Sequence, residues 1–177
     1  MRIVIALAAA ALVASSTAAA TADTTATCAD AAYAYAGVRS SVRTHGIRTV
    51  LTPLVEPTVA SGHVAAWIGV GGRDAGPNGE PEWIQVGVNA VPGRGLRLYY
   101  EWMRPGEPRA YGELGEALPG TSYVLAVVET ARDTWQVRVG GRAVLPPVQL
   151  PGSSRAWHPI ATAEARNDGA ADCNSFA

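Results

Sequence analysis

The stretch His63–Met103 decides the predicted fold and reads HVAAWIGVGGRDAGPNGEPEWIQVGVNAVPGRGLRLYYEWM. It contains three strand-like runs, separated by turns rich in Gly and Pro, over residues 63–70, 82–91 and 96–103. β-branched and aromatic residues bounded by such turns are typical of β-strands. We therefore expect these three runs to be strands and any functional site to lie on them.

The second and third runs each have one apolar face and one polar-aromatic face, because side chains alternate along a strand. The apolar faces consist of Ile84, Val86 and Val88 in the second run and of Leu96, Leu98, Tyr100 and Trp102 in the third. The opposite faces carry Trp83, Gln85, Gly87 and Asn89, and then Arg97, Tyr99, Glu101 and Met103. This pattern predicts a sheet whose back packs on the core and whose front faces solvent or a ligand.

Outside this stretch the chain continues the β pattern. Further strand candidates lie at 43–51, 110–114, 122–130, 133–139, 142–145, 157–166 and 173–177. Gly140-Gly141 is a strong hairpin signal between two of them. No segment has the 3.6-residue period of a capped helix. We predict an all-β fold, a two-sheet antiparallel β-sandwich over residues 43–177 that follows an N-terminal tether over 23–42.

The N-terminus has the layout of a secretory signal peptide over residues 1–22. Met1-Arg2 is followed by an apolar run over 3–14 and by a small, Ala-rich stretch over 15–22. A membrane anchor is the alternative, but an apolar run of about a dozen residues is shorter than the roughly 20 that a spanning helix needs. We therefore expect a secreted, extracellular protein.

The two Cys residues fit this expectation of export. Cys28 lies near the start of the mature chain and Cys173 near its end. An isolated pair in an exported protein is most simply a disulfide. In the chain-entropy model, a loop this long gives a stabilisation of about 4–5 kcal/mol.

Composition excludes several classes of function. The formal net charge is −1, and the basic residues are all Arg, scattered singly along the chain. This argues against nucleic acid or a membrane surface as the partner. The three His residues lack the spacing of metal ligands, so we expect no metal and no cofactor. Motifs of serine hydrolases, zinc peptidases and P-loop enzymes are absent from the sequence.

The polar-aromatic face leaves three interpretations open. In the first, a carboxylate activates a water as general base while the Gln85 amide donates a hydrogen bond to an oxyanion. In the second, the aromatic residues stack on sugars and the polar ones bind hydroxyl groups. In the third, this is simply the exposed face of a sandwich.

Three motifs resemble those of the glutamic peptidases, or eqolisins. AWIGVGG (66–72), WIQVGVNA (83–90) and YYEWMRPG (99–106) are similar to the family's AWVGIDG, LQTGVDF and WYEWYPD, in the same order. The resemblance implies a secreted endopeptidase that acts at acid pH, with a β-sandwich of lectin-like, concanavalin-like or jelly-roll shape. It also implies a catalytic Gln/Glu dyad, with water as the nucleophile and no covalent intermediate.

The resemblance assigns roles to individual residues. Gln85 matches the catalytic Gln, Trp67 matches the Trp of the first motif, and Glu101 matches a position in the substrate cleft. Trp83 and Tyr99 complete the expected substrate-binding set, so that the partner is a peptide or protein substrate and the protein a monomer. The rival hypothesis is a non-catalytic, lectin-like module that binds a glycan or a peptide.

Two departures from the family concern catalysis. Gly71 stands where the family has an Asp that supports the Gln. The catalytic Glu of the family lies in a late AEWIVE motif, whereas this chain has RAWHPIATAEAR over 155–166. If Trp157 sets the register, that Glu is absent. If Ala163-Glu164 sets it, Glu164 is either the catalytic Glu or the second acid of the motif. We predict Glu164 as the catalytic carboxylate.

Overall fold

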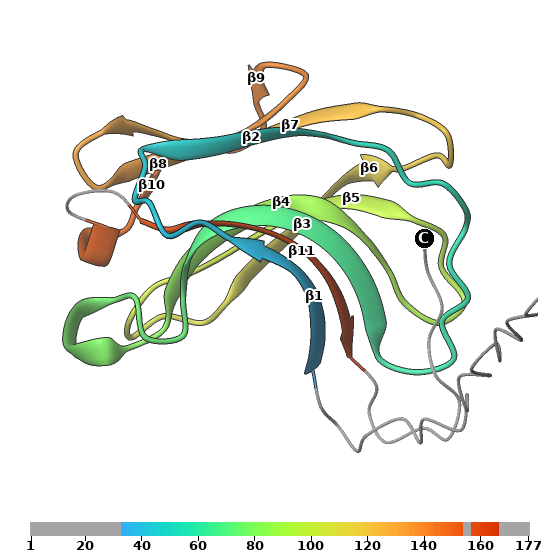
Figure 1. The fold of residues 1–177 in the computed structure, drawn as a ribbon, viewed down its shortest axis with the longest axis horizontal. Coiled ribbons are helices and arrows are strands. Elements are labelled where there is room, and N and C mark those ends of the chain that lie inside the picture. Colours follow the sequence, from blue (N-terminus) through green and yellow to red (C-terminus); the bar gives the residue numbers. More distant parts are fainter. Residues whose placement is uncertain (1–32, 154–156, 167–177) are drawn as a thin grey trace, which may run out of the picture.

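The three strands expected within His63–Met103 lie side by side at the centre of a six-stranded sheet (Figure 1). The structure is a computed structural model that describes residues 33–153 and 157–166. The central strands are β3 (His63–Gly72), β4 (Glu82–Ala90) and β5 (Arg97–Met103). They are flanked by β1 (Tyr33–Arg39), β11 (Pro159–Arg166) and β6 (Ala110–Glu116), in the order β1-β11-β3-β4-β5-β6. All neighbouring strands are antiparallel.

A second antiparallel sheet packs against the first in the order β10-β8-β7-β2, with β9 paired to β8 (Figure 1). Its strands are β2 (Gly46–Leu51), β7 (Tyr123–Ala131), β8 (Thr134–Val139), β9 (Arg142–Ala143) and β10 (Val148–Gln149). Two short 3₁₀ turns, η1 (Pro77–Gly79) and η2 (Pro151–Ser153), lie in connecting loops. The prediction of an all-β, two-sheet antiparallel sandwich is confirmed.

The core fills the space between the sheets, as the alternation predicted. On β4, Ile84 and Val86 are fully buried, and the other sheet contributes Leu125, Val127 and Trp135. The Trp135 ring stacks on Trp157 with their centroids 5.8 Å apart. Burying each large apolar side chain stabilises the fold by about 1.5–3 kcal/mol. Because side chains alternate along a strand, burial of these residues places their neighbours on the outward face of the six-stranded sheet.

Strand β1 corrects the predicted tether over 23–42. Residues Tyr33–Arg39 pair in full antiparallel register with β11, so the sandwich begins before residue 43. The strand was missed because it lies at the sheet edge. Its side chains are mostly exposed and show no apolar alternation, and backbone hydrogen bonds to β11 define it instead. The predicted signal peptide, Cys28, Cys173 and the strand at 173–177 lie outside the described residues.

The Gly140-Gly141 hairpin is confirmed, because it joins β8 to β9 with φ angles of 57° and 81°. Both angles lie in the left-handed region that favours glycine. Within the described ranges, no helix is long and apolar enough to cross a membrane.

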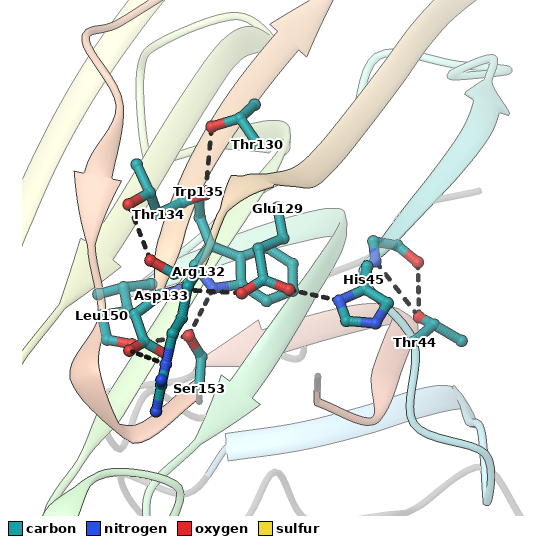
Figure 2. A network of polar contacts seen from close by, with 11 residues as sticks. Thr44, His45, Glu129, Thr130, Arg132, Asp133, Thr134, Trp135, Leu150 and Ser153 are labelled. Carbon is teal, nitrogen blue, oxygen red and sulfur yellow. Dashed lines mark hydrogen bonds and ion pairs between the residues drawn. The ribbon is translucent and has the colours of Figure 1, made fainter. Parts of the chain in front are cut away.

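A polar network closes the turn between β7 and β8 (Figure 2). The backbone N–H of Asp133 donates to Glu129 Oε1 over 2.9 Å, and His45 Nδ1 contacts Glu129 Oε2 at 2.5 Å. Asp133 has a φ of 58°, so the bond to Glu129 holds a residue in the left-handed region. Nearby, Trp135 Nε1 donates to the buried Ser153 Oγ over 2.7 Å.

Candidate active site

The outward face of the six-stranded sheet forms one cleft with a volume of about 750 Å³. The strands of this sheet arch so that their hollow side faces away from the second sheet (Figure 1). Residues from β1, β3, β4, β5, β6 and β11 line the cleft. All six site residues predicted from the sequence are among them, namely Trp67, Trp83, Gln85, Tyr99, Glu101 and Glu164.

Two glycines allow β3 and β4 to approach each other closely beside Trp67 and Gln85. Gly87 lies directly opposite Trp67, and Gly69 directly opposite Gln85, across the β3–β4 pair. A methyl group on Gly87 would lie 2.7 Å from Trp67 Cβ, and one on Gly69 would lie 2.8 Å from Gln85 Cβ. Real Cβ atoms are essentially never so close to a neighbour. The glycines of GVGG and QVGVN are therefore requirements of packing at this face.

The Glu164 carboxylate is held by two side chains of β3. Trp67 Nε1 donates to Oε2 over 2.8 Å, and His63 Nε2 lies 2.8 Å from Oε1. The strand register places Glu164 opposite Ala65 and on the cleft face, with the residue 7% exposed. Both carboxylate oxygens therefore have a protein partner.

The Gln85 amide points along the cleft toward β5. Its Nε2 donates to the Tyr99 hydroxyl over 3.1 Å, and both residues are buried. Burial, followed by the charges of Glu164 and Glu101, raises the pKa of Tyr99 well above its ordinary value. Tyr99 thus stays a neutral phenol that fixes the orientation of the amide.

Glu101 lies directly opposite Gln85 on the neighbouring strand β5. Trp83 Nε1 donates to its Oε1 over 3.3 Å, and Arg109 Nη1 lies 3.8 Å from the same oxygen. Burial raises the pKa of Glu101 above the ordinary 4.5, while Arg109 and the Trp83 hydrogen bond oppose this rise. A carboxyl group with a raised pKa holds its proton to higher pH than an ordinary Glu does.

Gln85 and Glu164 share the cleft without touching. Across the sheet, Glu164 is in register with Ala65 and Asn89, and Asn89 is four residues from Gln85 on β4. At about 3.3 Å per residue this is about 13 Å along the strand. The β11 position in register with Gln85 is Ile160, through Gly69.

His63, Arg109 and Tyr111 are among the cleft residues that were not predicted as site residues. His63 was considered only as a metal ligand, and its contact with Glu164 depends on the pairing of β3 with β11, which are far apart in sequence. Tyr111 stacks on Tyr99 with centroids 5.6 Å apart. Tyr111 is exposed on the edge strand β6, so the pattern of apolar residues in the sequence did not identify it as a cleft residue.

At the rim, charged and polar groups pair with one another. Arg94 and Arg97 contact Glu113 Oε2 at 2.8 and 3.3 Å, and Asn89 Nδ2 donates to the Tyr111 hydroxyl over 3.1 Å. In the parts of the chain that the structure describes, no group of three or more His, Cys, Asp or Glu could hold a metal ion.

No protein-family model and no curated protein sequence matches the chain. Among solved structures, it is similar to scytalido-glutamic peptidase with a transition-state-analogue inhibitor, at 14% identity and a TM-score of 0.51. A second structure of that peptidase, with a peptide-based transition-state analogue, gives 15% identity and a TM-score of 0.48. Each similarity covers 80% of this chain and 70% of the other. The suspected resemblance is thus confirmed at the level of the fold: the chain has the β-sandwich fold of a glutamic peptidase.

Proposed function

We propose that the protein is a glutamic-peptidase-like endopeptidase that hydrolyses peptide bonds at acid pH. The observation that carries the proposal is the position of the Gln85 amide, which lies within a long cleft whose side chains also include the carboxyl groups of Glu101 and Glu164. An amide donor and a carboxyl group in one cleft are the two groups that acyl transfer to water uses, the first at the oxyanion and the second for proton transfer.

In this reaction an ionised carboxylate takes a proton from a water, whose oxygen attacks the carbonyl carbon of the substrate. The Gln85 NH₂ group donates a hydrogen bond to the resulting oxyanion. The protonated carboxyl then gives its proton to the amine nitrogen as the C–N bond breaks. The products are a carboxylic acid and an amine, and no covalent intermediate with the protein forms. The sequence resemblance proposes Glu164 as this carboxyl group; Glu101, in the same cleft, is the alternative.

The aromatic residues define how a substrate would bind. Trp67 and Tyr99 lie in register on either side of Gly87, and Trp83 lies four residues along β4 from that row, so aromatic side chains line two parts of the cleft. An extended peptide offers both backbone polar groups and side chains to such a surface. Secretion, proposed from the signal-peptide layout at 1–22, would place this activity outside the cell.

Cleavage of a denatured protein substrate across pH 2–7 tests the proposal. Wild type should cleave at acid pH, and Gln85→Ala should lower kcat by about 10²–10³-fold, as for removal of an oxyanion donor. Gln149→Ala is the matched control, because Gln149 is exposed on the second sheet and far from the cleft in the fold. Absent cleavage by wild type, or equal cleavage by Gln85→Ala, would overturn the proposal.

A non-catalytic binding module is the second candidate, and one observation favours it: both oxygens of Glu164 have protein partners, and its carboxylate does not contact Gln85. In that case the cleft would hold a glycan or a peptide without hydrolysis. Binding on a glycan or peptide array that Trp83→Ala abolishes, with no product formed by wild type, would favour this candidate.

A further inference from the structure

We infer that Glu101, rather than Glu164, is the carboxyl group that works with Gln85, and that Glu164 is a positioning residue. This inference rests on the proposed peptidase function and names the second member of its catalytic pair. Three features of the cleft lead to it: the strand register, the partners of the carboxylate oxygens, and the charged groups around Glu101.

The register places Glu101 beside Gln85. The two residues are direct partners across β4 and β5 and face the cleft together. Side chains of such partners have their Cβ atoms about 4.5–5.5 Å apart. A substrate carbonyl and one water can bridge an amide and a carboxyl group at that spacing. On the other side of Gln85, the β11 residue in register is Ile160, which has no proton to exchange.

The oxygens of the two carboxyl groups differ in their partners. Trp83 and Arg109 both approach Oε1 of Glu101. Among the described residues, Oε2 of Glu101 has no hydrogen-bond partner, so it is available to a water. Each oxygen of Glu164 already has one protein partner, Trp67 at Oε2 and His63 at Oε1, so a water there would have to share its oxygen with a neighbouring side chain. A general base needs an oxygen that can accept the proton of the attacking water.

Charged and polar groups around Glu101 shift the pKa of its carboxyl group. Arg109 and the Trp83 hydrogen bond favour its ionised form, His63 acts in the same direction, and Glu164 opposes it. Burial outweighs them and raises the pKa of Glu101 above 4.5. Glu101 therefore holds a proton to higher pH than an ordinary Glu, which suits a group that accepts a proton and then returns it.

Glu164 has a different role in this arrangement. Its two contacts hold the indole of Trp67 and the imidazole of His63 at the β11 side of the cleft. Trp67 forms part of the apolar surface available to the substrate. Loss of Glu164 should therefore affect substrate binding more than the chemical step.

Steady-state kinetics of two isosteric variants test the assignment. Glu101→Gln should lower kcat by about 10²–10⁴-fold, the range for loss of a general acid–base group. Glu164→Gln keeps an acceptor for Trp67 but loses the negative charge beside His63, so KM should rise while kcat falls less than tenfold. A Glu101→Gln variant that keeps its kcat, or a Glu164→Gln variant that loses it, would overturn the inference.

The pH profile adds a readout that a purely structural role would not move. Arg109 lowers the pKa of Glu101, so Arg109→Gln should raise that pKa and shift the ascending limb of kcat/KM to higher pH. Arg94→Gln is the matched control, because Arg94 also lines the cleft but pairs with Glu113. An unmoved limb in Arg109→Gln, or equal shifts in both variants, would contradict the role of Glu101.

The failures of the two proposals are distinguishable. If wild type forms no product, the peptidase function is overturned and Glu101 has no reaction to serve. If wild type cleaves and Gln85→Ala does not, but Glu101→Gln remains active, the peptidase function stands and only the choice of carboxyl is wrong.

Discussion

Two partly buried carboxylates on opposite sheets show what separates a structural site from a reactive one. The side chain of Glu129, at the β7–β8 turn, is 8% exposed, and that of Glu101, in the cleft, is 12% exposed. Glu129 has a partner for each oxygen, the backbone of Asp133 and the ring of His45 (Figure 2). Glu101 has partners at one oxygen only. Exposure does not distinguish the two; the occupancy of the oxygens does.

Glu164 resembles Glu129 in this respect, although it lies in the cleft. Its partners are side chains from a neighbouring strand, and both of its oxygens are occupied. Fully paired carboxylates fix a conformation, since removing one partner of a buried polar pair costs more free energy than the pair contributes. The comparison therefore assigns a structural role to Glu129 and Glu164 and the proton-transfer role to Glu101.

The largest expected effect within this comparison comes from Glu129→Ala. The substitution removes the acceptor of the Asp133 N–H and the partner of His45, so the free energy of unfolding should fall by about 2–3 kcal/mol. Cleavage should be unchanged, because the turn is not part of the cleft. Urea unfolding together with kinetics measures both, and Glu116→Ala, at an exposed position on β6, is the control. Lost activity in the folded Glu129→Ala protein would break the comparison.

A smaller effect is expected at the neighbouring hydrogen bond. Ser153→Ala leaves the buried Trp135 Nε1 without its acceptor, which should cost about 1–2 kcal/mol of unfolding free energy. Ser122→Ala removes an exposed hydroxyl pair with Thr52 and should cost less. Denaturant midpoints of the two variants give the difference. Equal midpoints would show that the turn region does not depend on its buried polar contacts.

The smallest effect concerns Glu82, an intermediate case. This residue is fully buried; Oε2 accepts the Gly152 N–H over 2.7 Å, and Oε1 has no hydrogen-bond partner. Burial raises the pKa of Glu82 above its ordinary value, despite the Gly152 hydrogen bond. A raised folded-state pKa gives stability that is present below the unfolded pKa and is lost as pH rises through the folded one.

Wild type should therefore gain unfolding free energy relative to Glu82→Gln when the pH falls from 7 to 4. Thermal unfolding of both proteins at the two pH values measures this difference. Glu80→Gln, at an exposed position in the loop that precedes β4, is the control and should show no such change. A wild-type protein that loses stability relative to Glu82→Gln on acidification would contradict the assigned direction of the pKa.

Much of the sandwich could be predicted because its strands alternate. Ile84, Val86 and Val88 identified the core face of β4, and the opposite face then placed Gln85 in the cleft. The alternation of β5 did the same for Glu101. These inferences need only the period of a single strand, which the sequence contains in full.

Pairings between distant strands could not be predicted in the same way. The contacts of Glu164 depend on the register of β11 against β3, about a hundred residues away along the chain. A shift of one residue would have moved Glu164 to the other face of the sheet. The sequence resemblance therefore pointed to Glu164 as a catalytic residue. It could not show that Ile160 is the β11 residue in register with Gln85.

The glycines of the cleft have a consequence for how this protein can tolerate mutation. On the core side of β4, one branched aliphatic residue can replace another at modest cost. On the cleft side, Gly69 and Gly87 can accept no side chain at all, because the backbone oxygens of Ile84 and Ala66 would lie 2.6 and 2.1 Å from an added Cβ. Substitutions should therefore be tolerated least at Gly69 and Gly87, although these residues have no functional group. A mutational scan of the sheet would find its least replaceable positions at the glycines and only then at the polar residues beside them.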